Sequence, residues 1–351
     1  MSEGPPRLPR SEYDFPFPEE LVAAEPSAQR DSSRLMTLDR RTGAIGHHLF
    51  KDIVSLLSPG DTVVLNRSKV VPCRLAGKKP TGGAAELLLV REASPGVWHC
   101  LGTGVKPGVT VQLGGATAEA VGRLSDGLWE VRFSSQDVRG LLEKVGLPPL
   151  PPYIRSRRKK AGLADAVPSD MGRYQTVYAR EDGSLAAPTA GLHYTDTVLA
   201  ALRNKGVSVV EIVLHVGLGT FKPIVAEDCA EHEMLPETYE VSLHAADTIA
   251  RTSGRVVAVG TTATRTLETV FSGGVKAGPK AALKGQTFLY ITPGYEFRAV
   301  DVLQTNFHQP ASTPLLLACA FAGKERVFAA YQEAIARKYR LFSYGDAMLV
   351  T

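Results

Sequence analysis

The chain has 351 residues, of which 44% are hydrophobic and 22% are charged, and its formal net charge is +4. This length is enough for two domains, and the composition is that of an ordinary globular protein, which excludes a fibrous or largely disordered chain. The modest positive charge is compatible with a nucleic-acid partner but does not require one.

The four cysteines, Cys73, Cys100, Cys229 and Cys319, stand far apart and form no CxxC pair. This spacing favours neither a zinc site nor a disulfide framework, so we expect no metal and a reducing cytoplasm. The first segment, MSEGPPRLPRSEYDF, lacks the apolar stretch of a signal peptide. The apolar run 315–321 is too short to span a membrane, so no membrane partner is expected.

The first 70 residues predict part of an α/β core. Arg30, Asp31 and Arg34 crowd charges just before the apolar segment 35–38. Such a group is either a surface ion-pair cluster or a binding wall for a polar ligand. Residues 47–57 predict a helix, and residues 62–65 predict a buried strand.

Residues 71–150 change in character. Short β-prone runs alternate there with glycine turns, as in AAELLLVRE, GVWHCLGTG, GVTVQL and GLWEVRF. The spacing predicts a small inserted all-β domain, either a barrel or a sandwich. The proline-rich segment LPPLPPYI then predicts a stiff return linker.

Five basic side chains fall within the six residues 155–160, RSRRKK. Most charge runs of this kind are solvated surface loops. The functional alternative is contact with the phosphate backbone of a nucleic acid.

The stretch 185–221 carries two loops, APTAGLH and LHVGLGTF, joined by a helix and a strand at 207–216. Thr195 or Asp196 can cap that helix. The loops place two histidines and small hydroxyl residues among glycines, which suits a site where the backbone approaches a ligand. Two tight turns with buried core histidines are the alternative.

Three later segments add polar groups at strand or helix ends. Residues 255–260 predict a strand that runs into TTATR, where free backbone N–H groups and the helix dipole suit an anion, although simple helix capping gives the same pattern. Asn306 and His308 precede a helix capped by Ser312 or Thr313. Asp346 lies in a tight turn near the end of the chain, where an exposed surface carboxylate is the alternative.

Taken together, these motifs resemble the S-adenosylmethionine:tRNA ribosyltransferase-isomerases of queuosine biosynthesis. The resemblance covers nearly everything from Tyr13 to Val350. The matching segments include RDSSRL, LPPLPPYI, YQTVYA, AAPTAGLHYT, LHVGLGTFKP, RVVAVGTTATRTLE, TNFHQPAST and YRLFSYGDAML. The resemblance implies a barrel-like α/β core, residues 1–70 and 151–351, interrupted by a small antiparallel β-barrel, residues 71–150.

The implied reaction transfers the ribosyl group of S-adenosylmethionine to 7-aminomethyl-7-deazaguanine at the tRNA wobble position. The products are epoxyqueuosine, adenine and methionine. S-adenosylmethionine is therefore the co-substrate and tRNA the partner, and we expect a monomer without a metal. Proton transfers near neutral pH make histidines natural participants.

Within this resemblance, candidate roles fall on the residues of the matching motifs. The catalytic candidates are His193, His215, His308 and Asp346, with His193 first. The substrate-binding candidates are Asp31, Arg34, Tyr153, Tyr178, Thr189, Gly191, Gly217, Gly219, Thr220, Thr261, Thr262, Arg265, Asn306 and Tyr344. Among these, Arg265 can hold the methionine carboxylate and the tyrosines can stack on a base. The tRNA-binding candidates are Arg155, Arg157, Arg158, Lys159 and Lys160, together with the β domain.

The chain departs from the family pattern at two places. After GDTVVLN, the family usually reads Asp or Asn, Thr, Arg, whereas this chain reads Arg67, Ser68 and Lys69. Leu235 stands where the family usually has a histidine. These changes leave open a paralogue that moves the ribosyl unit to another acceptor. A non-catalytic binder of RNA or S-adenosylmethionine is a further alternative.

Overall fold

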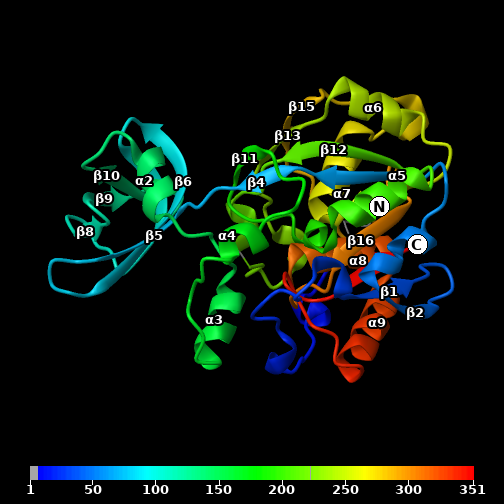
Figure 1. The fold of residues 1–351 in the computed structure, drawn as a ribbon, viewed down its shortest axis with the longest axis horizontal. Coiled ribbons are helices and arrows are strands. Elements are labelled where there is room, and N and C mark those ends of the chain that lie inside the picture. The colour runs from blue at the N-terminus through cyan, green and yellow to red at the C-terminus, as the bar shows by residue number, and fades with distance from the viewer. Residues whose placement is uncertain (1–6, 222) are drawn as a thin grey trace. The chain divides into compact units, whose positions relative to one another are not determined.

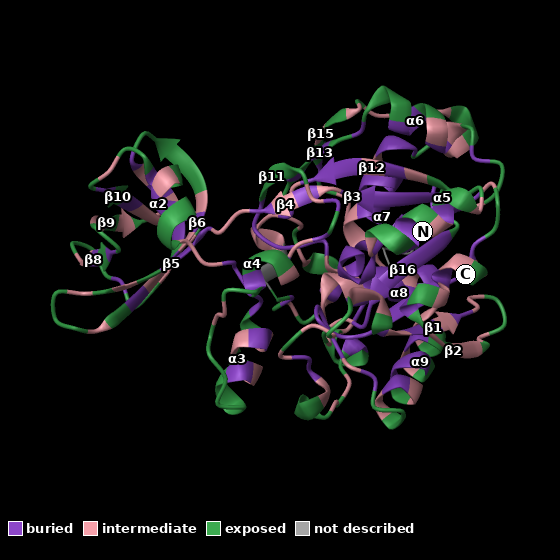
Figure 2. Ribbon diagram, in the orientation of Figure 1, coloured by how far each residue is buried: buried purple, intermediate pink, exposed green. Residues whose placement is uncertain are grey.

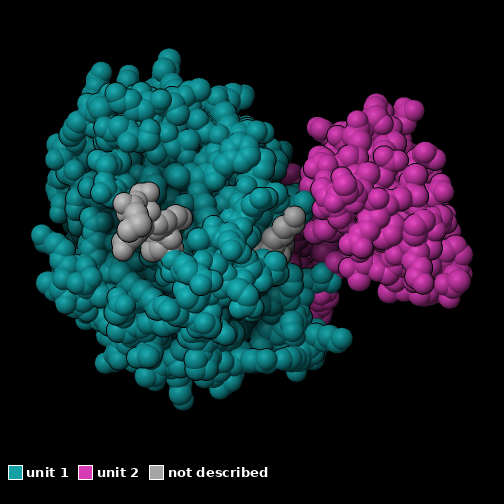
Figure 3. Space-filling view, turned by 180° about the vertical axis from the view of Figure 1, so that it is seen from behind, with its two compact units in different colours: residues 1–69, 152–163, 175–351 teal, residues 70–151, 164–174 magenta. Residues whose placement is uncertain are grey.

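The structure is a computed structural model that describes residues 7–221 and 223–351. It divides the chain into two compact units (Figure 3). The core unit comprises residues 1–69, 152–163 and 175–351, and the barrel unit comprises residues 70–151 and 164–174. Residues 164–174, which the sequence-based boundaries placed in the core, therefore group with the barrel unit.

The core unit is built on a mixed sheet of nine strands (Figure 1). Its strands are β1 (Arg34–Leu38), β2 (Ile45–Leu49), β3 (Thr62–Asn66), β12 (Ser208–Leu214), β13 (Glu237–Glu240), β14 (Val256–Val259), β15 (Lys284–Thr287), β16 (Val302–Asn306) and β17 (Ala347–Val350). They stand in the order β15-β13-β12-β3-β14-β16-β17-β1-β2. Strands β12, β3, β14 and β16 are parallel, and β17 is antiparallel to β16. The predicted α/β class is confirmed, with β15 and β2 as the two ends of this sheet.

The central strands have the continuous apolar sequences of strands that are covered on both faces. All five residues of β3, TVVLN, are buried (Figure 2). The strand predicted at 207–216 is β12. The helix predicted at 47–57 is wrong over its first part, because residues 45–49 pair with β1 as the strand β2.

Helices cover both faces of the sheet. On the first face, apolar side chains of α6 (Leu243–Ala250), α7 (Gly260–Val270), α8 (Thr313–Ala322) and α9 (Lys324–Ala336) pack with Leu303. On the second face, α1 (Ile53–Leu56) and α5 (Asp196–Asn204) pack with Val302. Because neighbouring strand residues point to opposite faces, Asn306 shares the second face with Val302.

Local capping agrees with the predicted helix starts. The side chain of Thr195 accepts a hydrogen bond from Val198 N at the start of α5, and Ser312 caps α8 in the same way. Two short 3-10 turns, η3 (Arg30–Ser32) and η5 (Thr189–His193), complete the second face. No helix in the described part of the chain is both long and apolar enough to cross a membrane.

The barrel unit is a closed antiparallel barrel in the order β10-β7-β6-β5-β8-β9, which confirms the inserted β-barrel. Its strands are β5 (Arg74–Lys78), β6 (Ala84–Ser94), β7 (Val97–Thr103), β8 (Thr110–Leu113), β9 (Ala116–Arg123) and β10 (Trp129–Phe133). The helix α2 (Val138–Val145) follows them, capped by Asp137. Buried and less buried residues alternate along β10 and β9, as expected of strands that enclose a core.

Candidate functional site

The carboxyl ends of the parallel strands meet at one edge of the core sheet, which we call the carboxyl edge. β16 ends at Asn306, and β17, which runs the other way, begins opposite it at Ala347. β1 is parallel to β17 and begins at Arg34. Polar residues from segments far apart in the chain are therefore gathered here. In open α/β sheets this is the edge where ligands bind.

Four side chains at this edge form a continuous chain of hydrogen bonds, which we call the edge network. Thr189 Oγ1 donates to Asn306 Oδ1 at 3.2 Å. Asn306 Nδ2 lies 3.1 Å from His193 Nε2, and His193 Nδ1 lies 2.7 Å from Ser33 Oγ. The segments that contribute are η5, the end of β16 and the residue before β1. The network joins three of the sequence motifs at one place.

His193 is buried and uncharged. Its ring stacks on Phe50 with a centroid distance of 5.0 Å, and only 4% of the residue is exposed. Burial, with the nearby charges of Arg340 and Arg30 acting in the same direction, lowers the pKa of His193 to about 3. The predicted histidine poised near neutral pH is therefore a neutral imidazole in this structure, with both ring nitrogens hydrogen-bonded.

Asp346 is a buried clamp at the same edge. Its carboxylate accepts hydrogen bonds from Arg34 N and Arg340 N, each at 2.8 Å, and pairs with Arg34 Nε at 3.3 Å. Only 2% of the residue is exposed, so the alternative of an exposed surface carboxylate is wrong. Arg34 also lies over the ring of Tyr339, 3.9 Å from its centroid. The ion pair of Asp346 with Arg34 fixes the chain where β17 and β1 begin.

Other predicted residues surround the edge network. Asp31 accepts a hydrogen bond from Thr195 Oγ1 at 3.2 Å. The Tyr178 hydroxyl occupies the space into which any side chain at Gly191 would project, so glycine is required there. Burial raises the pKa of Tyr178 well above its ordinary value, which keeps the phenol neutral.

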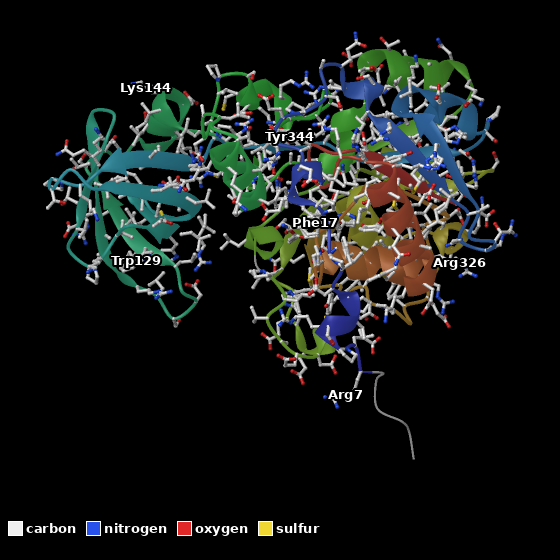
Figure 4. The ribbon with its side chains drawn as sticks, turned by 90° about the horizontal axis from the view of Figure 1, so that it is seen from below. Arg7, Phe17, Trp129, Lys144, Arg326 and Tyr344 are labelled. Atoms are coloured by element: carbon white, nitrogen blue, oxygen red, sulfur yellow. The ribbon has the colours of Figure 1, made fainter. Side chains whose placement is uncertain are left out.

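Two more tyrosines from the sequence prediction lie inside the core unit. Tyr344 is buried among the side chains of the core unit (Figure 4). Tyr153 is hydrogen-bonded to Ser343 and packs edge-on against Phe342. Burial raises the pKa of Tyr153 to about 12. Neither ring is an exposed stacking platform in this structure.

The other two predicted catalytic histidines do not join the edge network. His308 Nε2 bonds Thr305 Oγ1 at 2.8 Å, and its backbone N–H donates to the hydroxyl of Tyr331 on α9. Thr305 precedes Asn306 on β16 and so points to the opposite face of the sheet. His215 lies after β12, where its ring faces Gly183 of β11 (Glu181–Ser184). Burial lowers the pKa of both histidines, that of His308 to about 3.

The guanidinium of Arg265 is already engaged. It forms a buried ion pair with Glu237, and its Nε donates to Leu289 O at 2.8 Å. Glu237 also accepts a hydrogen bond from Gly217 N at 2.9 Å. The predicted role of Arg265 in holding a ligand carboxylate therefore conflicts with its position. The pair ties the loop after β12 to α7 instead.

The start of α7 has features of an anion site. In the part of the chain that the structure describes, no side chain caps its first turn, which contains Thr261 and Thr262. The hydroxyl of Thr262 is buried and has no hydrogen-bond partner among the described residues. Gly260, with a φ of +86°, turns the chain so closely past Ala190 of η5 that a side chain there is disfavoured. This turn thus lies beside the segment that carries Thr189 and His193.

Two loop candidates lie beyond β12. Gly219 has open space around it, with Leu235 Cβ 3.8 Å from the position of an added Cβ. Thr220 lies in η6 (Leu218–Phe221), and its side chain is outside the described part of the structure. Leu235, one of the departures from the family pattern, thus borders this glycine loop.

The basic run is a helix and not the predicted loop. In α3 (Pro152–Lys160), Ile154 and Arg158, four residues apart, lie on one face of the helix and are both buried. Arg158 donates from Nε to Ala24 O at 3.0 Å, which makes a phosphate contact by Arg158 untenable. Lys160 pairs with Glu19. Lys159 is exposed.

The departures at 67–69 have partners within the chain. Arg67 pairs with Glu181 at 3.2 Å, and Lys69 pairs with Asp182 at 3.1 Å. Ser68 Oγ accepts a hydrogen bond from Ser184 Oγ at 2.8 Å. All three partners lie on β11, which pairs with β4 (Ser68–Val70). The basic residues at this point therefore complement an acidic strand.

Three neighbours of His193 were not predicted from the sequence. They are Ser33, which is hydrogen-bonded to the ring, Phe50, which stacks on it, and Arg30, whose charge helps to lower its pKa. Ser33 stands within the segment RDSSRL, but an ordinary serine carries no signal that it will meet a histidine 160 residues later. Phe50 has no chemical signature either. Their roles depend on tertiary contacts.

The fold and the site define an α/β enzyme with an inserted β-barrel and a buried polar site at the carboxyl edge. A family model described as "Queuosine biosynthesis protein" matches residues 10–350. The chain therefore belongs to the queuosine biosynthesis protein family.

Named relatives are similar over their full length. The chain is 46% identical to an S-adenosylmethionine:tRNA ribosyltransferase-isomerase of Thermotoga petrophila, over 97% of this chain and 99% of that one. It is 47% identical to a protein of the same name from Citrifermentans bemidjiense, with the same coverage. A crystal structure of an S-adenosylmethionine tRNA ribosyltransferase from Thermotoga maritima matches with a TM-score of 0.53 and 37% identity, over 97% of this chain and 100% of that one.

Proposed function

We propose that the chain is an S-adenosylmethionine:tRNA ribosyltransferase-isomerase. It transfers and isomerises the ribosyl moiety of S-adenosylmethionine onto 7-aminomethyl-7-deazaguanine at the tRNA wobble position, giving epoxyqueuosine and releasing adenine and methionine. The observation that carries this function is the full-length match to relatives of that name. The edge network supports it, because it joins the motifs that the resemblance assigns to the site.

The reaction needs a group that accepts a proton from the 5′ carbon beside the sulfonium. His193 is the first candidate, because its ring is in the neutral form that a proton acceptor requires. Both ring nitrogens are occupied in this structure, so the substrate must replace one of these hydrogen bonds. Nε2 is the atom that faces the amide of Asn306, which in turn accepts the hydrogen bond from Thr189. We assign proton transfer to Nε2.

The methionine carboxylate is assigned to the start of α7. Backbone N–H groups of an uncapped helix start carry a partial positive charge. The Thr262 hydroxyl supplies a further donor that lacks a partner among the described residues. Arg265 stabilises this helix through Glu237 and acts on the ligand only indirectly.

The tRNA partner is assigned to the exposed part of α3. Lys159 is exposed and Arg157 partly exposed, and both lie outside the contacts of Arg158 with Ala24 and of Lys160 with Glu19. We further propose a cytoplasmic monomer that needs no metal. All four cysteines are free and buried, as is usual in a reducing compartment.

The test is a product assay with S-adenosylmethionine and tRNA that carries 7-aminomethyl-7-deazaguanine. The expected result is release of adenine and methionine together with epoxyqueuosine in the digested tRNA, followed by mass spectrometry. Adenine released only with another acceptor overturns the tRNA function in favour of a paralogue. S-adenosylmethionine binding without adenine release from any acceptor overturns enzymatic activity altogether.

A further inference from the structure

The orientation of the Asn306 side-chain amide is fixed by its surroundings. Its Nδ2 lies 3.3 Å from Phe342 O and 3.4 Å from Asp346 O, and both carbonyls can only accept hydrogen bonds. Its Oδ1 accepts from the hydroxyl of Thr189. The amide nitrogen therefore faces His193, and it can only donate. It follows that His193 Nε2 accepts this hydrogen bond and carries no proton.

The proton of the neutral His193 ring must then lie on Nδ1. Nδ1 is 2.7 Å from Ser33 Oγ, so the ring donates and the serine oxygen accepts. Ser33 keeps its own proton for the carbonyl of Arg30, 3.3 Å away. With only 3% of its surface exposed, Ser33 has little access to a competing solvent partner.

All hydrogen bonds in the edge network thus run in one direction. The order is from Thr189 to Asn306, from Asn306 to His193, from His193 to Ser33, and from Ser33 to the Arg30 carbonyl. If the ring proton were on Nε2 instead, the N–H of His193 and the N–H of Asn306 would point at each other. The Asn306 amide cannot turn to avoid this, because its oxygen would then face the carbonyl oxygens of Phe342 and Asp346.

We propose that Ser33 is a positioning residue, which together with Asn306 holds His193 in the tautomer with its proton on Nδ1 and an unprotonated Nε2. This inference rests on the proposed function only for its catalytic consequence. The tautomer itself is a property of the free protein. Ser33 does not touch the reacting atoms and acts through the ring of His193.

The first test measures the tautomer without substrate. Nitrogen-15 NMR of ring-labelled histidine distinguishes a protonated ring nitrogen from a bare one, and the His193 signals are identified by their loss in His193→Asn. At about neutral pH, the wild-type protein should show a bare Nε2 and a protonated Nδ1. A protonated Nε2 or a fully charged ring in the wild type overturns the proposal, whatever the variants do.

The second test compares two adjacent serines. Ser33→Ala removes the acceptor of the ring proton, whereas Ser32→Ala removes an exposed hydroxyl that donates to Gln29 O within the same turn. In Ser33→Ala we expect mixed tautomers and a kcat for adenine release that is lower by roughly 10- to 100-fold, the usual cost of losing a partner that orients a functional histidine. KM for S-adenosylmethionine should change less than kcat. Ser32→Ala should match the wild type in both readouts.

The outcomes separate this inference from the proposed function. Adenine release together with unchanged tautomers in a folded Ser33→Ala protein refutes the role of Ser33 and leaves the function intact. The expected tautomer without any adenine release refutes the function and leaves the network intact. If Ser33→Ala does not fold, Ser33→Cys takes its place with the same readouts and the same outcomes, because a thiol is only a weak acceptor for the ring proton.

Discussion

The two edges of the core sheet hold buried carboxylates of the same kind in different settings. At the amino edge, where β3 and β14 begin, Asp61 accepts hydrogen bonds from Ser58 N and Arg255 N and pairs with Arg255 Nη2 at 2.7 Å. At the carboxyl edge, Asp346 accepts from two backbone N–H groups and pairs with Arg34. Both carboxylates fix the start of a strand.

What differs is the group beside each carboxylate. The surroundings of Asp61 are saturated by backbone N–H groups and one arginine. The carboxyl edge adds the edge network, in which a neutral histidine has both ring nitrogens hydrogen-bonded to side chains. This contrast predicts that the Asp61 pair serves stability, whereas the edge network serves the proposed reaction.

The strongest test of this contrast is His193→Ala. General acid–base groups typically contribute 10²- to 10⁴-fold, so adenine release should fall by roughly that factor. Rapid-quench assays with saturating S-adenosylmethionine and modified tRNA measure it. His244→Ala, at an exposed position on α6, is the matched control and should retain wild-type activity. Unchanged adenine release in a folded His193→Ala protein shows that the catalytic role of His193 is wrong.

At the opposite edge, Asp61→Asn should cost stability and spare activity. It breaks an ion pair in which the carboxylate side chain is 2% exposed and the arginine 36%, so we expect a loss of about 2–3 kcal/mol, below the range for fully buried pairs. Urea unfolding measures the free energy, and adenine release per folded molecule should stay unchanged. Glu296→Gln removes an exposed pair with Arg298 and should cost under about 0.5 kcal/mol. Equal losses in the two variants contradict a structural role for Asp61.

The Asp61 pair also has a defined pH range. Burial raises the pKa of Asp61, but the hydrogen bonds from Arg255 and Ser58 together outweigh it and lower the pKa below its ordinary value. A lowered carboxyl pKa contributes stability above the pKa of the unfolded chain, about 3.9 for Asp, and loses it as the pH falls further. The difference between wild type and Asp61→Asn should therefore be constant near neutral pH and shrink only below about pH 4.

The uncharged state of His193 predicts a loss of stability in the same direction, as the pH falls, but over a higher pH range. The folded protein leaves this ring neutral down to a pKa of about 3, whereas the unfolded chain binds the proton near pH 6.5. Stability from this group is thus lost as the pH falls from about 6.5 toward 3. His193→Asn should reduce the slope of unfolding free energy against pH in that range by up to about 1.4 kcal/mol per pH unit. Urea melts of the wild type and of His193→Asn at several pH values test this.

The smallest expected effect concerns Lys69, which lies neither in the edge network nor beside Asp61 or Asp346. Its pair with Asp182 is largely exposed, so Lys69→Ala should change stability by less than about 0.5 kcal/mol. Adenine release with the same modified tRNA should stay within about two-fold of wild type, since exposed pairs of this kind are screened and weak. A switch to another acceptor in this variant contradicts the view that the departure at 67–69 complements β11.

Much of the architecture is already determined by the sequence. The unbroken apolar run of β3 predicts a strand covered on both faces, and the alternation in 71–150 predicts the inserted β unit. Thr195 and Ser312 identify two helix starts. These features depend on local patterns, namely side-chain period and capping chemistry, which lie within a few residues of one another.

Only the tertiary structure decided how the functional groups meet. His193 finds its partners 160 residues away at Ser33 and 113 residues away at Asn306, and no local pattern records such distances. Arg265 was expected to face a ligand, but the folded chain places Glu237 against it. The basic run lies in a helix on which Ile154 and Arg158 share a buried face, and their burial is a result of tertiary packing. The order of the strands and the burial of each charge fix these contacts, and both arise only when the whole sheet has formed.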